Sequence, residues 1–243
     1  MSNEQSELAG QVAVVSGGSG GIGTAILEGF RRAGAVAVSL DVCPPKQPGT
    51  LWVKCDVRED ASVQAAIANV LEAHRRIDIV IHGAGVSREG VVWKLAVDDW
   101  DFIQSVNLRG AFLLLRHTIP AMRKNSGGRV VLIGSINGSR GKFGTSAYSA
   151  SKAGLLGLAK SVARETGRFG ILVNVVEPGW VRTALTEALP KEIQDAAAAE
   201  SPIGQLLEPS DVAAMVRFLC GPSARRITGQ LFRVDGGQYL GAY

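Results

Sequence analysis

A tyrosine and a lysine four residues apart have the spacing in this sequence that best suits acid–base chemistry. Tyr148 and Lys152 lie in a stretch of helical periodicity, so both side chains should project from one face of a helix. A neighbouring ammonium lowers the pKa of a phenol from about 10 toward the range where it exchanges protons with an alcohol or carbonyl. Taken alone, the pair also fits an ordinary exposed helix face.

A glycine-rich turn near the start of the chain indicates a phosphate-binding site. From Ser16 to Gly23 the sequence reads SGGSGGIG, directly after an apolar run and directly before a helical pattern. A helix N-terminus offers unpaired N–H groups, and residues without Cβ let the backbone approach a pyrophosphate. The turn alone is weak evidence, because a flexible connection between a strand and a helix has the same composition.

Two aspartates at predicted strand ends strengthen the interpretation of the glycine-rich turn as a dinucleotide-binding site. Asp41 follows Gly23 by 18 residues, near the spacing at which a carboxylate holds the ribose diol of a dinucleotide. This carboxylate would repel a 2′-phosphate, so the sequence favours NAD(H); NADP(H) stays the alternative because Lys46 is close in sequence. Asp56 ends the third predicted strand and could reach the adenine. Both aspartates also suit simple strand-end turns.

Short apolar runs alternate with longer helical patterns, which predicts an α/β fold with a doubly wound, seven-stranded parallel sheet flanked by helices. The runs are β-branched and apolar on both faces, as expected of strands covered on two sides. The predicted strands are 12–15, 36–40, 51–55, 77–81, 129–133, 172–176 and 231–234. The predicted helices are 22–33, 61–75, 98–124, 146–168 and 209–219.

The chain reads as a single domain over residues 1–243. No linker composition divides it, residues 1–10 read as a flexible tail, and the long segment 183–205 has the length of a substrate lid. With 243 residues, 46% hydrophobic and 20% charged, a compact globular protein is expected and a disordered one is excluded.

The net charge and the cysteine content limit which partners and which cellular compartment are expected. The net charge of +4 comes from scattered basic residues, so no nucleic-acid partner is expected. Three widely spaced cysteines favour a reduced, cytoplasmic protein and no metal site, and no apolar run is long enough for a membrane span.

These motifs together resemble the short-chain dehydrogenase/reductase family over nearly the whole chain. Within it, length and C-terminal pattern are most similar to the 3-oxoacyl-(acyl-carrier-protein) reductase group. The resemblance rests on the glycine turn, Asp41, Asp56-Val57, Asn107, Ser135, Tyr148 with Lys152, Pro178-Gly179, and residues 234–237. It implies a Rossmann fold, an NAD(P) cofactor and a homotetramer, and the apolar surplus of helices 98–124 and 146–168 agrees with buried subunit contacts.

The resemblance also implies roles for individual residues. Tyr148 would be the general acid in carbonyl reduction and the base in alcohol oxidation, while Ser135 polarises the substrate oxygen. Lys152 would bind the nicotinamide ribose and lower the pKa of Tyr148, and Asn107 would hold a water that links Lys152 to solvent. The implied cofactor-binding residues are Ser16, Gly17, Ser19, Gly21, Ile22, Gly23, Asp41, Asp56, Val57, Gly83, Ala84, Tyr148, Lys152, Pro178, Gly179, Val181 and Thr183.

Two departures from the family pattern affect the substrate and the cofactor turn. His82-Gly83-Ala84-Gly85 stands where the family has Asn-Asn-Ala-Gly, so we expect His82 to brace the turn. The positions for basic carrier-docking residues fall near Ser126 and Phe169, which are not basic, although Arg123, Lys124, Arg129 and Arg168 lie close by. The expected substrate-lining residues are Ser87, Ile136, Asn137 and Trp180.

Three functional hypotheses follow. The leading one is an NAD(P)-dependent oxidoreductase that interconverts a ketone and a secondary alcohol, acting on a small carbonyl or alcohol substrate and above all on a 3-oxoacyl thioester of CoA or acyl carrier protein. The alternative is an NAD-dependent dehydrogenase of a small alcohol, hydroxy acid, cyclic alcohol or sugar. The remote alternative is a non-catalytic dinucleotide sensor, a class that tends to lose the tyrosine or lysine retained here as Tyr148 and Lys152.

Overall fold

A seven-stranded parallel sheet forms the centre of the molecule. The computed structural model describes residues 7–240, and its strand order is β3-β2-β1-β4-β5-β6-β7. The strands are β1 (Val12–Ser16), β2 (Val36–Asp41), β3 (Leu51–Lys54), β4 (Ile79–His82), β5 (Gly128–Ile133), β6 (Ile171–Pro178) and β7 (Leu231–Val234). All six neighbouring pairs are parallel, so each connection must cross over a face of the sheet. The predicted doubly wound Rossmann fold is confirmed.

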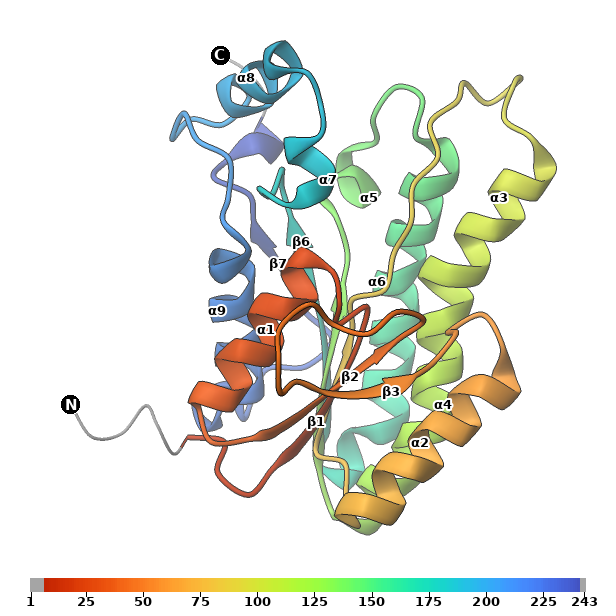
Figure 1. Cartoon of the computed structure of the whole chain (residues 1–243), viewed down its shortest axis with the longest axis vertical. Helices are drawn as coiled ribbons and strands as arrows, with labels where there is room; N and C mark the ends of the chain where they lie inside the picture. Colours follow the sequence, from red (N-terminus) through yellow and green to blue (C-terminus); the bar gives the residue numbers. More distant parts are fainter. Residues whose placement is uncertain (1–6, 241–243) are drawn as a thin grey trace.

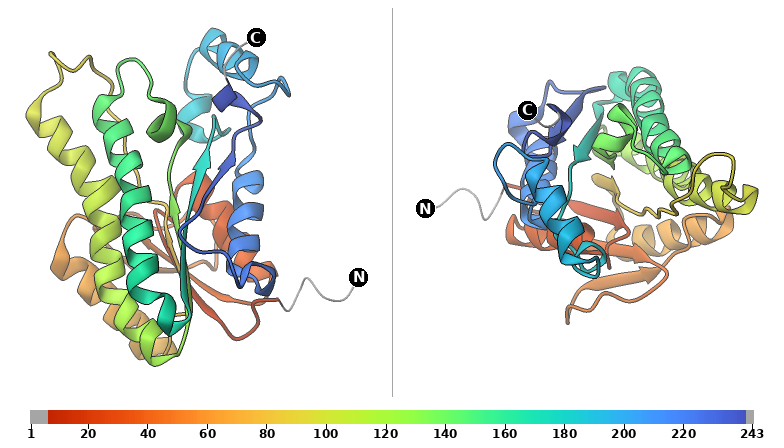
Figure 2. Two further views of the ribbon diagram at one scale, coloured as in Figure 1. Left: turned by 180° about the vertical axis from the view of Figure 1, so that it is seen from behind. Right: turned by 90° about the horizontal axis from the view of Figure 1, so that it is seen from above.

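Helices cover both faces of this sheet (Figures 1 and 2). One face carries α1 (Gly21–Arg32) and α9 (Pro209–Cys220), which pack against each other. The other carries α2 (Asp60–His74), α3 (Val97–Gln104), α4 (Gly110–Lys124) and α6 (Ser146–Thr166). Two apolar cores result, one on each face, because the central strands present aliphatic side chains in both directions.

The two edge strands are less buried than the sequence predicted for strands covered on both faces. β1 and β4 are buried along their whole length, whereas β3 is mostly exposed and β7 is only partly covered. β3 is an edge strand paired only with β2, so no helix needs to cover both of its faces.

The helix predicted over 98–124 is present as one continuous helical stretch, but it is not a regular α-helix throughout. A π-helical turn, Ser105–Arg109, separates α3 from α4 and inserts an extra residue into the helical register. Residues 146–168 end earlier than predicted, at Thr166, and a 3₁₀ turn follows. Three short helices had no periodic signal: α5 (Ile136–Arg140), α7 (Ala184–Glu187) and α8 (Lys191–Ala199).

The predicted flexible tail is also too long. Leu8 is fully buried in the core beside α1, and its N–H donates to the carbonyl of Ala33 at 2.9 Å. The apolar side chain of Leu8 gains more by packing than the backbone loses in freedom, so residues 7–10 form an ordered turn. Residues 1–6 of that prediction lie outside the described residues.

The strand order reverses between β1 and β4, and parallel α/β sheets bind ligands at such a point beyond the carboxyl ends of the strands. Ser16 and His82, the last residues of the two strands, are paired in register. α7 and α8, which span most of the predicted lid, lie above this edge of the sheet in Figure 1. Within residues 7–240, no helix is both long and apolar enough to cross a membrane.

Candidate active site

Helix α6 and the end of β5 bring the acid–base residues together. Tyr148 and Lys152 lie in the first two turns of α6, one turn apart as predicted. Ser135 follows β5 and caps α5, where its Oγ accepts the N–H of Asn137 at 3.2 Å. Ser135 and Tyr148 line the same cavity, and the Ser135 side chain partly offsets the rise that burial causes in the pKa of Tyr148, so two residues distant in sequence act at one position.

Lys152 is the buried cation of the site. Its side chain is 4% exposed and its Nζ donates to the carbonyl oxygen of Ile133 at 2.7 Å. The Nζ lies 5.8 Å from the centre of the Tyr148 ring. Burial lowers the pKa of Lys152 from 10.5 to about 8, because an ammonium loses hydration in the protein interior.

The sequence predicted a lowered pKa for Tyr148, and the structure corrects this. Burial raises the pKa of Tyr148 above 10.0, and the hydrogen bond with Ser135 opposes that rise only in part. The Lys152 ammonium is directed to a backbone carbonyl and does not reach the phenol as a hydrogen-bond donor. At neutral pH Tyr148 is therefore a protonated acid, the form that donates a proton to a carbonyl oxygen.

Asn107 sits in the π-helical turn and fixes the loop after β4. Its Oδ1 accepts the N–H of Val86 at 2.8 Å, and its Nδ2 donates to the Val86 carbonyl at 3.0 Å and to Ser151 Oγ at 2.9 Å. Ser151 Oγ in turn donates to the Tyr148 carbonyl at 2.7 Å. The amide of Asn107 thus holds the tyrosine helix against the cofactor loop, and the water-binding role expected of Asn107 stays a prediction.

His82 connects three segments of the site as a fully buried brace. Its Nδ1 lies 2.9 Å from Ser16 Oγ, and its Nε2 lies 3.1 Å from the main-chain oxygen of Asn107. A carbonyl only accepts, so Nε2 must carry the proton and Nδ1 accepts from the serine hydroxyl. Burial, together with repulsion from Lys152, lowers the pKa of His82 from 6.5 to about 3, which keeps the ring neutral.

This buried neutral histidine predicts a loss of stability in mild acid. Between pH 6.5 and about pH 3, His82 is protonated in the unfolded chain but not in the folded protein. The stability of the fold therefore decreases as the pH falls below 6.5. From neutral pH to near pH 5 this group should cost about 2 kcal/mol. Urea unfolding of wild type and His82→Asn at both pH values measures this loss of stability. The wild type should show it and His82→Asn should not.

His74→Asn, at the partly exposed end of α2, is the matched control. Its stability should depend on pH as that of the wild type does. If His82→Asn loses as much stability between the two pH values as wild type does, His82 does not stay neutral in the folded protein.

The glycine turn has the shape of a dinucleotide phosphate cradle. Gly17 has a φ of +70°, and a Cβ there would lie 2.6 Å from the backbone nitrogen of Ala84. A Cβ on Gly23 would collide with the backbone oxygen of Gly17. No side chain caps the N-terminus of α1, so its first N–H groups are open to a phosphate.

Asp41 lies beside the glycine turn and is hydrogen-bonded to it. Its Oδ2 accepts the N–H of Ser19 at 3.0 Å, and its Oδ1 accepts the N–H of Cys43 at 3.3 Å. Both carboxylate oxygens therefore stay beside the glycine turn, at the end of β2, where the spacing argument placed a ribose-binding group.

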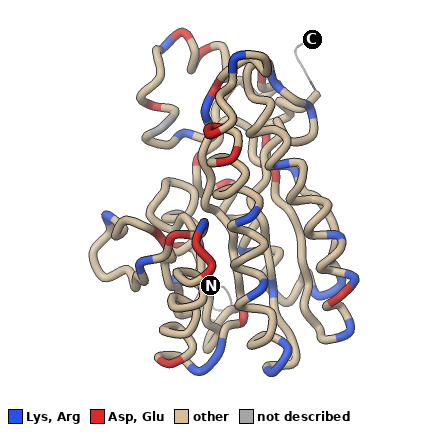
Figure 3. Tube along the Cα trace, turned by 90° about the vertical axis from the view of Figure 1, so that its right-hand side faces the viewer, with Lys and Arg blue, Asp and Glu red and all other residues tan. Residues whose placement is uncertain are grey.

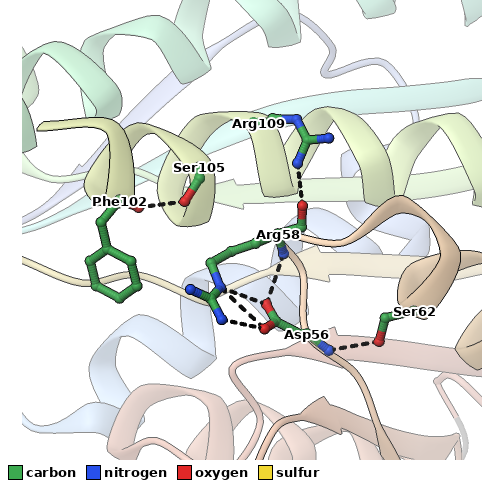
Figure 4. Close-up of polar contacts among 6 residues, drawn as sticks. All are labelled: Asp56, Arg58, Ser62, Phe102, Ser105 and Arg109. Carbon is green, nitrogen blue, oxygen red and sulfur yellow. Dashed lines mark hydrogen bonds and ion pairs between the residues drawn. The ribbon is translucent and has the colours of Figure 1, made fainter. Parts of the chain in front are cut away.

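Asp56 and Arg58 form an ion pair (Figure 4), and both line the same cavity as Asp41. Arg58 makes a bidentate pair with Asp56, with Nη2 to Oδ2 at 2.6 Å, and its guanidinium lies 5.4 Å from the centre of the Phe102 ring. Arg58 lowers the pKa of Asp56 through this hydrogen bonding. Sequence reasoning missed Arg58, although it stands two residues after Asp56; its charge is already neutralised by that carboxylate.

Two cavities meet along the carboxyl edge of the sheet. One of about 490 Å³ lies between Asp41, Asp56 and Phe102, and one of about 500 Å³ lies in front of Tyr148. Both are lined by Gly83, Gly85 and Val86, so they form one continuous groove. The second is lined by the predicted residues Ser87, Ser135, Ile136, Asn137, Tyr148, Lys152, Pro178, Gly179, Trp180, Val181 and Thr183, together with Ile22 and Gly83 of the cofactor set.

The remaining predicted cofactor residues fall at the first cavity or beside it. Gly17, Ser19, Asp41, Asp56, Val57, Gly83 and Ala84 line it. Ser16 Oγ reaches the N–H of Ala84 at 3.5 Å from behind the turn, and Gly21 lies against Thr183. The groove thus offers glycine backbone to a pyrophosphate, a carboxylate to a ribose and an acid to a carbonyl. These features fit a nicotinamide dinucleotide.

Comparisons with known proteins agree with this geometry. A family model described as enoyl-(acyl carrier protein) reductase matches residues 17–238. The chain is 34% identical over 244 residues to the 3-oxoacyl-(acyl-carrier-protein) reductase of Vibrio cholerae, covering 96% of this chain and 99% of that protein. It is 32% identical over 241 residues to the Thermotoga maritima protein of the same name, covering 95% and 98%.

A solved structure shows the same architecture. The ligand-free aldohexose dehydrogenase of Thermoplasma acidophilum superposes with a TM-score of 0.94 at 29% identity, covering 98% of this chain and 97% of that one. The chain belongs to the short-chain dehydrogenase/reductase family and is an NAD(P)-dependent oxidoreductase acting on CH–OH groups.

Proposed function

We propose that the protein is an NAD(H)-dependent reductase of a 3-oxoacyl thioester carried by CoA or acyl carrier protein. The observation that carries the proposal is the placement of Tyr148, Ser135 and Lys152 on a groove that ends at Asp41. The full-length similarity to two 3-oxoacyl-(acyl-carrier-protein) reductases supports the choice of substrate.

In this proposal the residues of the chain share the work of carbonyl reduction. The bound dinucleotide supplies the hydride. Ser135 donates a hydrogen bond to the substrate carbonyl oxygen, and Tyr148 transfers its proton to that oxygen as negative charge develops there. Lys152 holds a positive charge behind the phenol, which stabilises the tyrosinate left after the transfer. Asn107 and Ser151 keep the tyrosine helix in place.

The rate of NADH oxidation with acetoacetyl-CoA tests the thioester proposal. Turnover that exceeds the rate with small ketones, and that is stereospecific in the hydroxyacyl product, is the expected result. A purified protein that binds NADH but does not reduce acetoacetyl-CoA would contradict it.

A second candidate is an NAD-dependent dehydrogenase of a small alcohol, hydroxy acid, cyclic alcohol or sugar. The surface near Ser126 and Phe169, the two carrier-docking positions that are not basic, favours this second candidate. Arg123 and Arg168, the nearby basic residues, both stack on Phe169, at 4.3 and 4.7 Å from its ring centre. The similarity to an aldohexose dehydrogenase also supports it. Oxidation of a panel of sugars, polyols and hydroxy acids with NAD⁺ separates the two candidates. A non-catalytic sensor stays the remote alternative.

Asp41 should set the cofactor preference. Substitution Asp41→Ala removes the carboxylate that would hold the ribose diol and repel a 2′-phosphate, so the ratio of kcat/KM for NADH over NADPH should fall at least about tenfold. Steady-state kinetics with both cofactors measure it. Asp98→Ala, on the exposed start of α3, is the matched control. An unchanged ratio in Asp41→Ala would remove the basis for the NAD(H) preference.

We also propose a cytoplasmic homotetramer. Phe112 on α4 and Phe218 on α9 are both about half exposed, on opposite faces of the molecule, which gives two apolar contact surfaces. Light scattering at micromolar concentration should give the mass of four chains, and Phe112→Asp should reduce it to two. A single-chain mass for wild type would contradict the assembly. In the view of Figure 3, acidic and basic residues are interspersed at both ends of the molecule.

A further inference from the structure

The substrate cavity has a cation at its mouth that the reaction chemistry does not use. The Nζ of Lys142 lies 4.4 Å from the centre of the Trp180 ring, and both side chains line the cavity in front of Tyr148. Among residues 7–240, no carboxylate lies within ion-pair distance of Lys142. Glu89 lines the same cavity without forming that pair. Within the described residues, Lys142 therefore carries a positive charge that no ion pair neutralises, in the cavity that Tyr148 also lines.

The loop that carries Lys142 is fixed. The N–H and Oγ1 of Thr145 both donate to the Lys142 carbonyl, at 3.2 and 2.9 Å. The N–H of Gly90, in the loop after β4, donates to the Gly144 carbonyl at 2.8 Å, and Gly90 pairs with Thr145 as an isolated bridge. Because two loops from different parts of the chain are bound together here, the base of the Lys142 side chain has a defined position at the cavity mouth.

A second donor lies in the same cavity lining. The Oδ1 of Asn137 accepts from Arg140 Nε at 3.2 Å, which fixes the orientation of the amide. The Nδ2 group has no partner within the described part of the chain, so its hydrogens are available to an acceptor in the cavity. An ammonium and an amide N–H₂ in one cavity suit an oxyanion with more than one oxygen.

We propose that Lys142, held over Trp180, is the anion-binding group of the substrate cavity and pairs with a carboxylate or phosphate carried by the substrate. This inference rests on the proposed function only in taking the cavity in front of Tyr148 as the substrate's. The anion is either the carboxylate of a short oxo acid or the phosphate of a pantetheine arm. Both form the same charge-assisted hydrogen bonds with an ammonium.

Binding to the enzyme–NAD⁺ complex, measured by calorimetry without turnover, tests the inference and separates the two sources. Acetoacetate is compared with its neutral methyl ester, and pantetheine 4′-phosphate with pantetheine. Lys142→Met should weaken one of the two anions at least about tenfold, equal to about 1.4 kcal/mol, and its neutral partner less than about twofold. Lys142→Arg should retain the affinity. Lys160→Met, on the exposed side of α6, is the matched control.

The anion that loses affinity identifies the source of the charge. If Lys142→Met weakens neither anion, or weakens each anion and its neutral partner equally, Lys142 is not an anion-binding group. Failure of the enzyme to reduce any ketone would count against the proposed function alone, since these affinities do not depend on hydride transfer.

Discussion

Replacing Tyr148 with phenylalanine should reduce kcat for carbonyl reduction at least about a thousandfold, while the Kd for NADH changes less than about threefold. The phenylalanine ring fills the same space at the start of α6 but has no proton to give to the substrate oxygen. Positioned proton transfer contributes about a hundredfold to ten-thousandfold to the rate of such a step. Single-turnover absorbance of NADH measures the chemistry, and quenching of protein fluorescence measures cofactor binding.

Tyr239→Phe is the matched control, because its ring stacks 3.6 Å from the Arg233 guanidinium outside the groove. That variant should turn over at the wild-type rate. A Tyr148→Phe enzyme as fast as its parent would end the assignment of Tyr148 as the acid.

The raised pKa of Tyr148 also predicts how the reaction rate depends on pH. Burial raises the pKa, so the acid form persists above the pH at which a free tyrosine ionises. Ionisation of Tyr148 should therefore lower the kcat for reduction only in strong alkali, whereas loss of the Lys152 proton near pH 8 should lower it earlier. The reverse oxidation needs the ionised phenol and should rise with pH over the same interval. A reduction rate that falls between pH 7 and 9 with Tyr148 as the titrating group would contradict this order.

Lys152→Met should have the second large effect, with a loss of about a thousandfold in kcat and a gain in stability at neutral pH. The variant loses the charge that stabilises the tyrosinate, which explains the slower reaction. It also removes a buried ammonium whose pKa the fold lowers from 10.5 to about 8. A charged lysine in the interior opposes folding, and a methionine of similar length does not.

The sign of this effect can be checked by pH. Between about 8 and 10.5 the unfolded chain holds a proton on Lys152 that the folded protein has released, so wild-type stability should rise with pH through this interval. The slope attributable to Lys152 is about 1.4 kcal/mol per pH unit. Urea unfolding of wild type and Lys152→Met measures the difference between their slopes. Lys160→Met, on the solvent side of the same helix, should keep the wild-type slope.

Equal slopes in wild type and Lys152→Met would show that the ammonium is well solvated in the folded protein. A Lys152→Met variant with normal kcat would show that Tyr148 needs no cation behind it.

Much of the fold follows from local patterns in the sequence. All seven strands lie within a few residues of their apolar runs. For the central strands the reason is that a strand buried on both faces must be continuously apolar. The prediction failed where tertiary packing outweighs periodicity. The π-helical turn at Ser105–Arg109 exists where Asn107 bonds to Val86 and Ser151, partners far away in sequence. Leu8 is ordered for a similar reason, through its contact with the core beside α1.

The sequence by itself determined the chemistry that is available: a phenol and an ammonium one helical turn apart, and a glycine turn followed at a fixed spacing by Asp41. Those relations are local, so residue type and spacing suffice to specify them. Only the tertiary structure decided the state of these groups. The raised pKa of Tyr148, the lowered pKa of Lys152 and the neutral ring of His82 all come from burial by elements that are distant in sequence.

Contacts between separate loops were decided by the same folding. Lys142 reaches Trp180 across two different connections of the sheet, and no spacing rule links a loop after α5 to a loop after β6. The sequence thus determined which reaction the chain is equipped to perform. The charge at the cavity mouth, and hence the substrate that fits, depends on long-range packing, because electrostatic energies are set by three-dimensional distance and solvent exclusion.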